Sequence, residues 1–494
     1  MTSDGGLTVV FTGHTGLEKR RVLDRLCEFI YSKDPDWCDL KDIPNQSFRE
    51  TREKELAQVY GAEDILDSTF LTRPARDQQD LWRTSFLKAL HRWKYERPRP
   101  KFAFLSLHLT LQSHSQFFSP LAWRIPPDFE DTLVKHLSEE FRPRHCITLI
   151  DDVYTVQKRI REHGYNFRLI ELLRWRNVEI LMTDLLAQHV ISKECRIEDR
   201  ERYPFEHSPV IAVRHPTSML HSFLLAPEIP RIYASYPISE PRRIAEKTGS
   251  NAPIQEINRF RSALHEKFTV FDPLSIDERP MQILMSKAPK FEEANLRSVI
   301  DEALSKSGKE GIDLAPELER SIKAHVGVNQ SDEIVLRAAN MWPGIECETL
   351  SGDDPTDARL SLNEVEEIAT EIGEEGSEID RQIRSRDYRM IDQADYIIVY
   401  RPTYCRKEWS GGTYHEVLYA RAVGKRSIII RDPESDGPLA DPPFGLDLPP
   451  RDVFDKVRNL DQSENQAQVL SAVADDIAES AKDLATKGFR PVIS

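Results

Sequence analysis

Paired cysteines, long apolar runs and a positive net charge are all missing from this 494-residue sequence. The six cysteines stand at positions 27, 38, 146, 195, 347 and 405. They form no CxxC pair, which excludes an obvious zinc ribbon and predicts free thiols in a reducing compartment. No apolar run approaches the roughly 18 residues of a membrane span, and no signal peptide is recognisable. The net charge of -15 disfavours direct nucleic-acid binding. We therefore expect a soluble, cytoplasmic protein.

The composition is that of a globular protein. Hydrophobic residues make up 39% of the chain and charged residues 30%, which argues against wholesale disorder. At roughly 150 residues per domain, the length predicts about three domains, or two with a large insertion. Cores of that size need neither disulfides nor a structural metal for stability.

Short β-rich runs alternate with helical patterns in two successive parts of the chain. In the first part the runs are LTVVFTG (7–13), KFAFLSLHLTL (101–111), HCITLIDDV (145–153) and SPVIAVRHP (208–216). In the second part they are PRIYASYPIS (230–239), FTVFDPL (268–274), DQADYIIVY (392–400) and RSIIIRDP (426–433). Such strands are typical of parallel sheets covered on both faces. We predict two α/β domains, 1–228 and 229–494, with a helical and acidic insertion at about 278–382 and a packing helix within 465–488.

The first strand leads into a loop with part of a phosphate-binding motif. A P-loop is a strand, the motif GxxxxGK[ST] and a helix; its N–H groups wrap phosphate, its Lys reaches the terminal phosphates and its hydroxyl binds Mg²⁺. Here the loop reads GHTGLEKR (13–20), and a helical pattern follows. Gly13, Gly16 and Lys19 stand where a nucleoside-monophosphate-kinase-like loop would place them. The first domain therefore resembles a P-loop kinase.

Two positions depart from this motif. Glu18 replaces the glycine before the lysine, and Arg20 replaces the Mg²⁺-binding Ser or Thr. Since a carboxylate repels phosphate and an arginine ligates no cation, we expect a degenerate regulatory or scaffolding domain with ATP turnover near background. Asp151 ends a strand like the acid that holds Mg²⁺ in such proteins, although Asp151 and Asp152 could equally cap the next helix. The predicted nucleotide-binding residues are Gly13, Gly16, Lys19 and Asp151, and Mg²⁺ with a nucleoside triphosphate stays an open ligand.

The segment SGGTYHEVLYARAVGK (410–425) reads as a Gly-rich turn that opens a helix after a buried strand. Backbone N–H groups at such a turn form an anion site. We expect Glu416 in the first helical turn, where a carboxylate stays ionised, and Val417, Leu418 and Ala420 packed on the sheet. Two interpretations are open: a carboxylate aimed at a ligand, or a charge that only complements the helix N-terminus.

Four segments in order resemble the nucleoside 2-deoxyribosyltransferase family. They are RIYASYPIS, FTVFDPL, RDYRMIDQADYIIVYRP and SGGTYHEVLYARAVGKRSIII, and they cover about 229–275 and 383–435. The resemblance implies that Glu416 is the nucleophile that attacks the anomeric carbon, that Tyr233 orients it and that Asp387 contacts the base. The glycine after the family's glutamate is Leu418 here, which we expect to affect helix packing more than chemistry. The predicted fold is thus a P-loop-kinase-like parallel-sheet domain followed by a Rossmannoid deoxyribosyltransferase-like domain with a helical insertion.

Ser410 departs from the family in an informative way. The aspartate that stands there in transferases accepts a hydrogen bond from the sugar 5′-hydroxyl and would repel a 5′-phosphate. A serine beside the amides of Gly411 and Gly412 would instead hold a phosphate, and the related nucleoside 5′-monophosphate N-glycosidases resemble this chain in having serine there. NAD⁺ also carries a 5′-phosphorylated ribose. The predicted substrate-binding residues are Ser410, Gly411, Gly412 and Ser235.

Five other polar residues have less specific predictions. His415 is expected on another face of its helix. Asp392 and Asp395 are expected at a helix end and a strand start. Arg242 and Arg243 either contact phosphate or are exposed.

These features predict a nucleotide N-glycosidase that cleaves the base–sugar bond of NAD⁺ or a nucleoside phosphate, the departing base being protonated by Asp387 or water. The alternatives are a non-catalytic nucleotide sensor and a nucleoside deoxyribosyltransferase. No cofactor or metal is expected for the cleavage. The fusion resembles toxin-like effectors of antiviral defence that deplete nucleotides. We expect a homo-oligomer without membrane or nucleic-acid partners, and a regulatory protein partner is left open.

Overall fold

The chain forms two compact units, residues 1–213 and 214–494, and each is described by itself. The computed structural model describes residues 6–34, 53–61, 70–113, 116–120, 133–191, 207–248, 250, 252–276, 326–328, 333–337, 357–401, 411–431, 455–459, 468–469, 471–475 and 477. The division lies before the predicted boundary at 228/229, because helix α8 (Thr217–Leu225) packs against strand β9 (Thr269–Phe271) of the second unit.

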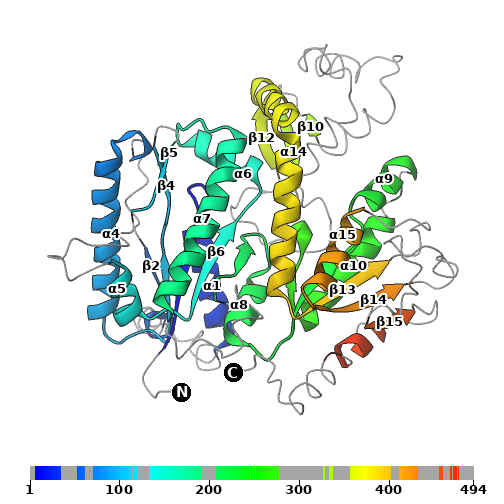
Figure 1. The fold of residues 1–494 in the computed structure, drawn as a ribbon, viewed down its shortest axis with the longest axis horizontal. Helices are drawn as coiled ribbons and strands as arrows, with labels where there is room; N and C mark the ends of the chain where they lie inside the picture. Colours follow the sequence, from blue (N-terminus) through cyan, green and yellow to red (C-terminus); the bar gives the residue numbers. More distant parts are fainter. Residues whose placement is uncertain are drawn as a thin grey trace, which may run out of the picture. The chain divides into compact units, whose positions relative to one another are not determined.

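The first unit contains a parallel five-stranded sheet in the order β2-β3-β1-β6-β7 (Figure 1). Its elements are β1 (Leu7–Thr12), α1 (Lys19–Lys33), β2 (Ala57–Gly61), η1 (Phe70–Thr72), α4 (Ala75–Tyr95), β3 (Phe102–Ser106), β4 (Leu111–Ser113), β5 (Gln116–Phe118), α5 (Leu133–Lys135), η2 (His136–Phe141), β6 (His145–Ile150), α6 (Val153–Glu162), α7 (Leu169–Val190) and β7 (Val210–Ala212). The predicted strands near 7, 101, 145 and 208 are confirmed as β1, β3, β6 and β7.

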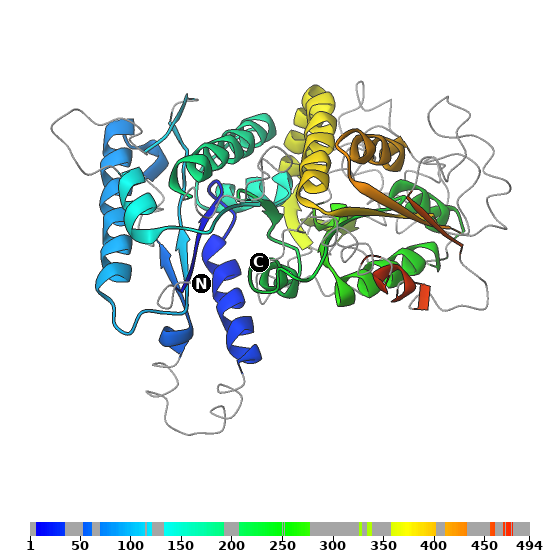
Figure 2. The ribbon, with the colours of Figure 1, turned by 60° about the horizontal axis from the view of Figure 1, so that its bottom comes forward.

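Strand β1 lies at the centre of this sheet, between β3 and β6. The loop after β1 therefore meets the loops that follow β3 and β6 at the carboxyl edge of the sheet, where helix α1 begins (Figure 2). All six residues of β6 are buried, as a strand covered on both faces requires.

The second unit contains another parallel five-stranded sheet, in the order β15-β14-β13-β8-β9. Besides α8 and β9, its elements are β8 (Arg231–Ser235), α9 (Ser239–Thr248), α10 (Ala252–Lys267), η4 (Pro273–Ser275), β10 (Val326–Val328), β11 (Glu333–Arg337), β12 (Asp357–Ser361), α14 (Leu362–Gln393), β13 (Tyr396–Arg401), α15 (Gly411–Ala422), β14 (Arg426–Arg431) and β15 (Lys456–Asn459). Numbered along the chain, the strand order is 2-1-3-4-5, and its direction of growth reverses between β8 and β13. Ligands of such sheets bind outside the carboxyl ends of the strands at this switch point.

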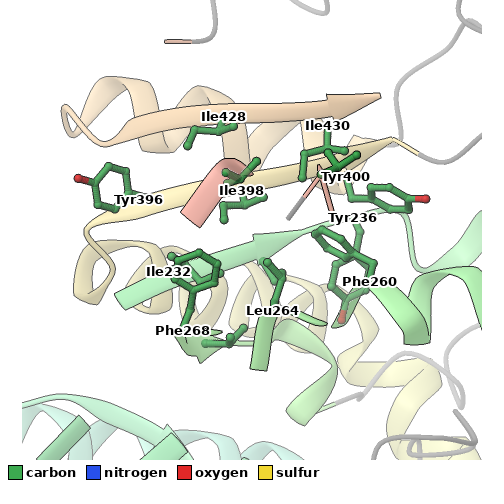
Figure 3. Packing of buried hydrophobic residues seen from close by; sticks show 14 of the residues in the cluster. Ile232, Tyr236, Phe260, Leu264, Phe268, Tyr396, Ile398, Tyr400, Ile428 and Ile430 are labelled. Atoms are coloured by element: carbon green, nitrogen blue, oxygen red, sulfur yellow. The ribbon is translucent and has the colours of Figure 1, made fainter. Parts of the chain in front are cut away.

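The two faces of this sheet have different partners, because side chains alternate along a strand. On one face a hydrophobic cluster joins β8, β13 and β14 to α10 (Figure 3). The cluster includes Ile232, Tyr236, Phe260, Leu264, Phe268, Tyr396, Ile398, Tyr400, Ile428 and Ile430. Tyr233 and Ser235 alternate with Ile232 and therefore project from the opposite face, which is the face that α14 and α15 cover.

Parts of the predicted insertion and tail are also described. Helix α14 runs from the acidic segment into the region that carries Asp387, and β10, β11 and β12 form an antiparallel sheet. The helical stretches expected between 290 and 325 lie outside the described residues. In the tail, Val469, Val473 and Ile477 join the hydrophobic cluster at helical spacing, so the predicted packing helix is confirmed for the residues described between 468 and 477.

The fold is thus α/β with two parallel sheets, as predicted. No helix in the described part of the chain combines the length and hydropathy that crossing a bilayer requires.

Candidate functional site

Glu416 belongs to the buried stripe of helix α15. Thr413, Glu416, Val417 and Ala420 recur at helical spacing and are all buried, with Glu416 8% exposed. The prediction that Glu416 lies in the first turn is wrong, because the helix already begins at Gly411 and Glu416 is in the second turn. A carboxylate in a buried stripe is costly unless it receives hydrogen bonds.

The stripe also corrects the prediction for Leu418, which is 36% exposed instead of packed on the sheet. Position 418 lies outside the repeat that faces β8, β13 and β14. The Leu418 side chain therefore lies outside the buried stripe of α15.

Two hydroxyl groups of β8 lie beside Glu416. The Ser235 hydroxyl donates to Oε2 of Glu416 over 2.5 Å, and Ser235 is fully buried. Tyr233 is also fully buried; burial, followed by the charges of Asp387 and Glu416, raises the pKa of its hydroxyl well above the usual value. This hydroxyl therefore stays protonated as a donor. It completes no hydrogen bond of ordinary geometry with a described residue, although it lies close enough to Glu416 for that carboxylate to affect its pKa.

Helix α14 brings Asp387 to the same place. Asp387 is 8% exposed and accepts hydrogen bonds from Nε and Nη2 of Arg386 over 3.2 and 3.0 Å. Its negative charge acts on the Tyr233 hydroxyl, which places it near the Tyr233–Glu416 pair. The structure therefore brings together Glu416, Asp387, Tyr233 and Ser235, at the switch point between β8 and β13.

A contact between α14 and α15 fixes the two helices that carry these carboxylates. The rings of Tyr388 and Tyr419 stack with centroids 4.1 Å apart and an interplanar angle of 9°. The Tyr419 hydroxyl donates to both oxygens of Asp392 over 3.0 and 2.9 Å. Tyr388 follows Asp387 directly, and Tyr419 lies one helical turn after Glu416. The stack therefore holds the two acidic residues in a fixed relation.

A buried ionic cluster lies at the carboxyl ends of β8 and β9. Asp272 accepts hydrogen bonds from Arg261 Nε over 2.7 Å and from the Tyr236 hydroxyl. Burial alone would raise the pKa of Asp272, but the charge of Arg261, with His265 and Tyr236, lowers it far below its usual value. The charge of Glu416 also reaches Tyr236. This cluster anchors the chain that follows Ser235.

The remaining predicted residues of this unit are placed as follows. Ser410 lies outside the described residues. Gly411 and Gly412 are the exposed first residues of α15, and a β-carbon on either would meet nothing within 4 Å. His415 is exposed, as predicted.

Four charged residues complete this account. Asp392 lies in the last turn of α14, and Asp395 precedes β13, both as predicted. Arg242 and Arg243 lie in α9, and their side chains are outside the described part of the structure.

In the first unit, the loop between β1 and α1 has three residues with positive φ. They are Gly13 at 138°, Gly16 at 86° and Glu18 at 49°. A β-carbon on Gly13 would lie 2.8 Å from the Leu149 carbonyl oxygen, so glycine is required there. Glu18 adopts the left-handed conformation despite its side chain, at a cost of about 1–2 kcal/mol.

Lys19 is buried beneath this loop. Its Nζ donates to the Gly13 carbonyl over 2.6 Å and lies 3.0 Å from His108 Nδ1. The Glu179 carboxylate lies nearby and accepts hydrogen bonds from the backbone N–H groups of Gly13, Leu109 and Thr110. Burial lowers the pKa of Lys19 to about 7, against the charge of Glu179, which raises it. The negative charge of the Glu179 carboxylate thus compensates the positive charge of Lys19 beneath the loop.

Asp151 and Asp152 have different roles. Asp152 caps α6 by accepting from the Thr155 N–H over 2.8 Å, which confirms the capping alternative for this residue. Asp151 is fully buried: its Oδ1 accepts from the Asp152 N–H over 2.8 Å, and its Oδ2 pairs with Arg159 Nη1 over 3.0 Å. Both Asp151 oxygens are therefore engaged by the protein itself.

Comparison with protein-family models and with curated proteins finds no match for this chain. Among the described residues, no cluster of three or more His, Cys, Asp or Glu side chains is arranged to share a metal ion.

Sequence reasoning missed four partners of the predicted residues, namely Arg386, His108, Arg159 and Glu179. Arg386 is adjacent to Asp387 in the sequence, and this adjacency could have identified it as the ion-pair partner. Arg159 lies 8 residues from Asp151, but the contacts of His108 with Lys19, Arg159 with Gly16 and Glu179 with Gly13 span 89 to 166 residues. No local pattern identifies such contacts.

Proposed function

We propose that the second unit is a nucleotide N-glycosidase of the deoxyribosyltransferase-like kind, with Glu416 as its nucleophile. The observation that carries the proposal is a carboxylate placed in a buried helix stripe beside two hydroxyls and a second carboxylate. An apolar side chain at 416 would pack there without needing partners, so the site favours chemistry over stability.

The proposed reaction has two steps. A Glu416 oxygen attacks C1′ of the sugar, and the C1′–N bond breaks with its electron pair moving to the base. The nicotinamide of NAD⁺ leaves as a neutral molecule, whereas the base of a nucleoside phosphate takes a proton from water. Water then attacks C1′ of the glycosyl ester, one of its protons passes to the solvent, and the Glu416 carboxylate leaves. Tyr233 and Ser235 orient the carboxylate through their hydroxyls. Asp387 is paired with Arg386, so we assign it to accepting a hydrogen bond from the base, not to protonating it.

The proposed substrate carries a 5′-phosphate or pyrophosphate, as NAD⁺ and nucleoside phosphates do. Helix α15 begins at Gly411, and the first N–H groups of a helix have no partner within it. Ser410 directly precedes them. Two charge-assisted hydrogen bonds to phosphate, each about 1.5–3 kcal/mol, would favour a nucleotide over its nucleoside by about a hundredfold or more.

The substrate class can be tested with Ser410→Asp. We expect the new carboxylate to reverse the preference between a nucleoside 5′-monophosphate and its nucleoside, measured as kcat/KM. If Ser410 only caps the helix, Asp substitutes well and the preference stays unchanged. That outcome would contradict phosphate recognition at this end of α15.

The reaction itself can be tested with Glu416→Gln. We expect base release from a panel of NAD⁺ and nucleotides, followed by chromatography, to fall at least about 10³-fold in the variant, because the amide keeps the volume and loses the nucleophilic charge. Glu256→Gln is the matched control: this carboxylate accepts from the Tyr400 hydroxyl over 2.6 Å on the opposite face of the same sheet. Undiminished base release from Glu416→Gln would refute the assignment.

The same assay separates the alternatives. A nucleoside deoxyribosyltransferase would transfer the sugar to an added second base, and a non-catalytic sensor would bind nucleotides without releasing base. The proposal further includes a homo-oligomer and a role in nucleotide-depleting antiviral defence, both taken from the family resemblance.

A further inference from the structure

The cation site implied by the P-loop resemblance does not fit the residues of the first unit. Such a site needs a hydroxyl after the lysine and a carboxylate at the end of the neighbouring strand. Arg20 replaces the hydroxyl, and its Nε pairs with Asp24 Oδ1 over 2.8 Å on the helix surface. Asp151 is fully buried with both oxygens engaged. Neither residue presents an oxygen to Mg²⁺.

Arg159 is the cationic partner of Asp151. Its Nη1 donates to Asp151 Oδ2 over 3.0 Å and to the Gly16 carbonyl over 3.1 Å, so the guanidinium joins the end of β6 to the loop. Its side chain is 14% exposed. A guanidinium carries five N–H donors in a planar fork that matches phosphate oxygens. The Arg159 group therefore has the charge and the geometry to contact an anion at the loop.

A second arginine adds to the positive charge. Arg176 is buried, and its Nη1 lies 3.4 Å from the Asp151 carbonyl oxygen. Its charge also reaches the loop, where burial and the charges of Arg176 and Lys19 lower the pKa of His14 to about 3. The guanidinium groups of Arg159 and Arg176 together carry the same formal charge as one Mg²⁺ ion. Unlike a bound ion, these two groups belong to the protein.

The loop also contains a polar group without a partner. Thr15 lies between Gly13 and Gly16 and is only 5% exposed. Its buried hydroxyl forms no hydrogen bond with any described residue. Buried hydroxyls are normally satisfied. An oxygen-rich anion in the loop would supply the missing partner.

We infer that this loop binds the phosphate chain of a nucleotide in its metal-free form, with Arg159 and Arg176 in place of Mg²⁺. Chelation by Mg²⁺ removes negative charge from the phosphates and adds a hydrated cation next to two arginines. The metal complex should therefore bind more weakly than the free polyphosphate. This preference is opposite to that of a P-loop that retains its hydroxyl and acidic residue.

The inference is tested by calorimetric titration of the full chain with ATP, in EDTA and in excess Mg²⁺. We expect binding in EDTA and about tenfold or greater weakening in Mg²⁺. Inorganic tripolyphosphate is the second probe, since it retains the phosphates and lacks the nucleoside. Binding that requires Mg²⁺, or no binding of either probe, would overturn the inference. Because the second unit is also proposed to bind nucleotides, binding is assigned to the first unit only where Arg159→Gln weakens it, and this outcome is separate from the loss of base release in Glu416→Gln.

Two variants sharpen the test. Arg159→Gln should weaken metal-free binding about 10- to 100-fold, as expected for the loss of one charge-assisted contact. Lys158→Gln is the matched control, because it removes a charge from the same helix at a surface pair with Glu162. Asp151→Asn should tighten metal-free binding, because it removes the anion that competes for Arg159. In a Mg²⁺ site the same change would weaken binding. Thermal melting of each variant shows whether it is folded, and unchanged binding by folded Arg159→Gln would refute the role of that residue.

Discussion

Ser235→Ala tests whether the hydroxyl nearest Glu416 controls its charge and orientation. The Ser235 hydroxyl donates to Glu416 over 2.5 Å from a fully buried position. Removing it leaves the backbone of β8 intact, because alanine fits wherever serine does. It also withdraws one donor from a carboxylate that must be ionised to act as a nucleophile.

The size of the effect follows from this contact. A hydrogen bond to a buried charged group contributes about 1.5–3 kcal/mol, which is about 10- to 150-fold in an equilibrium. The loss of Ser235 should therefore move the acid limb of the pH profile of kcat/KM upward by roughly 1–2 units. Base release should fall about 10- to 150-fold at pH values below the limb, and the deficit should shrink as the pH rises.

The assay is kcat/KM for base release between about pH 4 and 9, a range that covers both sides of a carboxylate's titration. Ser427→Ala is the matched control, because Ser427 is a buried serine of strand β14 in the same sheet, and its N–H donates to Asp455. A deficit of equal size at every pH would mean that Ser235 acts only through packing. No deficit at all would refute the assignment of Ser235 as a positioning residue.

Two further predictions concern stability. Glu18→Gly should raise the free energy of unfolding in urea by up to about 1 kcal/mol, because it relieves the left-handed strain of about 1–2 kcal/mol and loses only an exposed ion pair with Arg21. Glu18→Ala retains a β-carbon and should show no gain; equal changes in both variants would contradict the strain. Arg261→Met should destabilise the protein by about 3–5 kcal/mol at pH 7, because it leaves the Asp272 carboxylate buried without its cation. The pKa of Asp272 is lowered in the folded state, so the stability that it contributes is present above about pH 4 and is lost as the pH falls further. The difference between wild type and Arg261→Met should therefore shrink below about pH 4, and a constant difference would argue against the pair.

The sequence predicts the sheets better than it predicts the site. Continuous apolar runs identify β1, β6, β8 and β13, because strands covered on both faces need apolar side chains along their whole length. The position of Glu416 was misjudged by a turn, since Gly411 and Gly412 resemble a loop. In the structure they are the first two residues of helix α15.

The polar contacts were beyond reach of sequence reasoning for a different reason. Glu179 meets Gly13 across 166 residues, and Arg159 meets Gly16 across 143 residues. Local spacing cannot encode contacts that arise only when the strands assemble in the order β3-β1-β6. For the same reason, the sequence left open whether Asp151 resembles a Mg²⁺-holding acid or caps a helix, whereas the fold pairs it with an arginine.

Two exceptions to the local rules of protein structure, one in each unit, occupy comparable positions. Glu416 is a carboxylate in a buried helix stripe, and Glu18 is a side chain in the left-handed region. Both lie where the chain leaves a central parallel strand and enters a helix, at the edge where open α/β sheets bind ligands. A buried carboxylate and a side chain in the left-handed region both cost free energy. An apolar residue at position 416 or a glycine at position 18 would remove that cost. Exceptions of this kind concentrate at functional sites. The two carboxylates therefore support the ligand sites that we propose for the two units, N-glycosidic cleavage in the second and polyphosphate binding in the first.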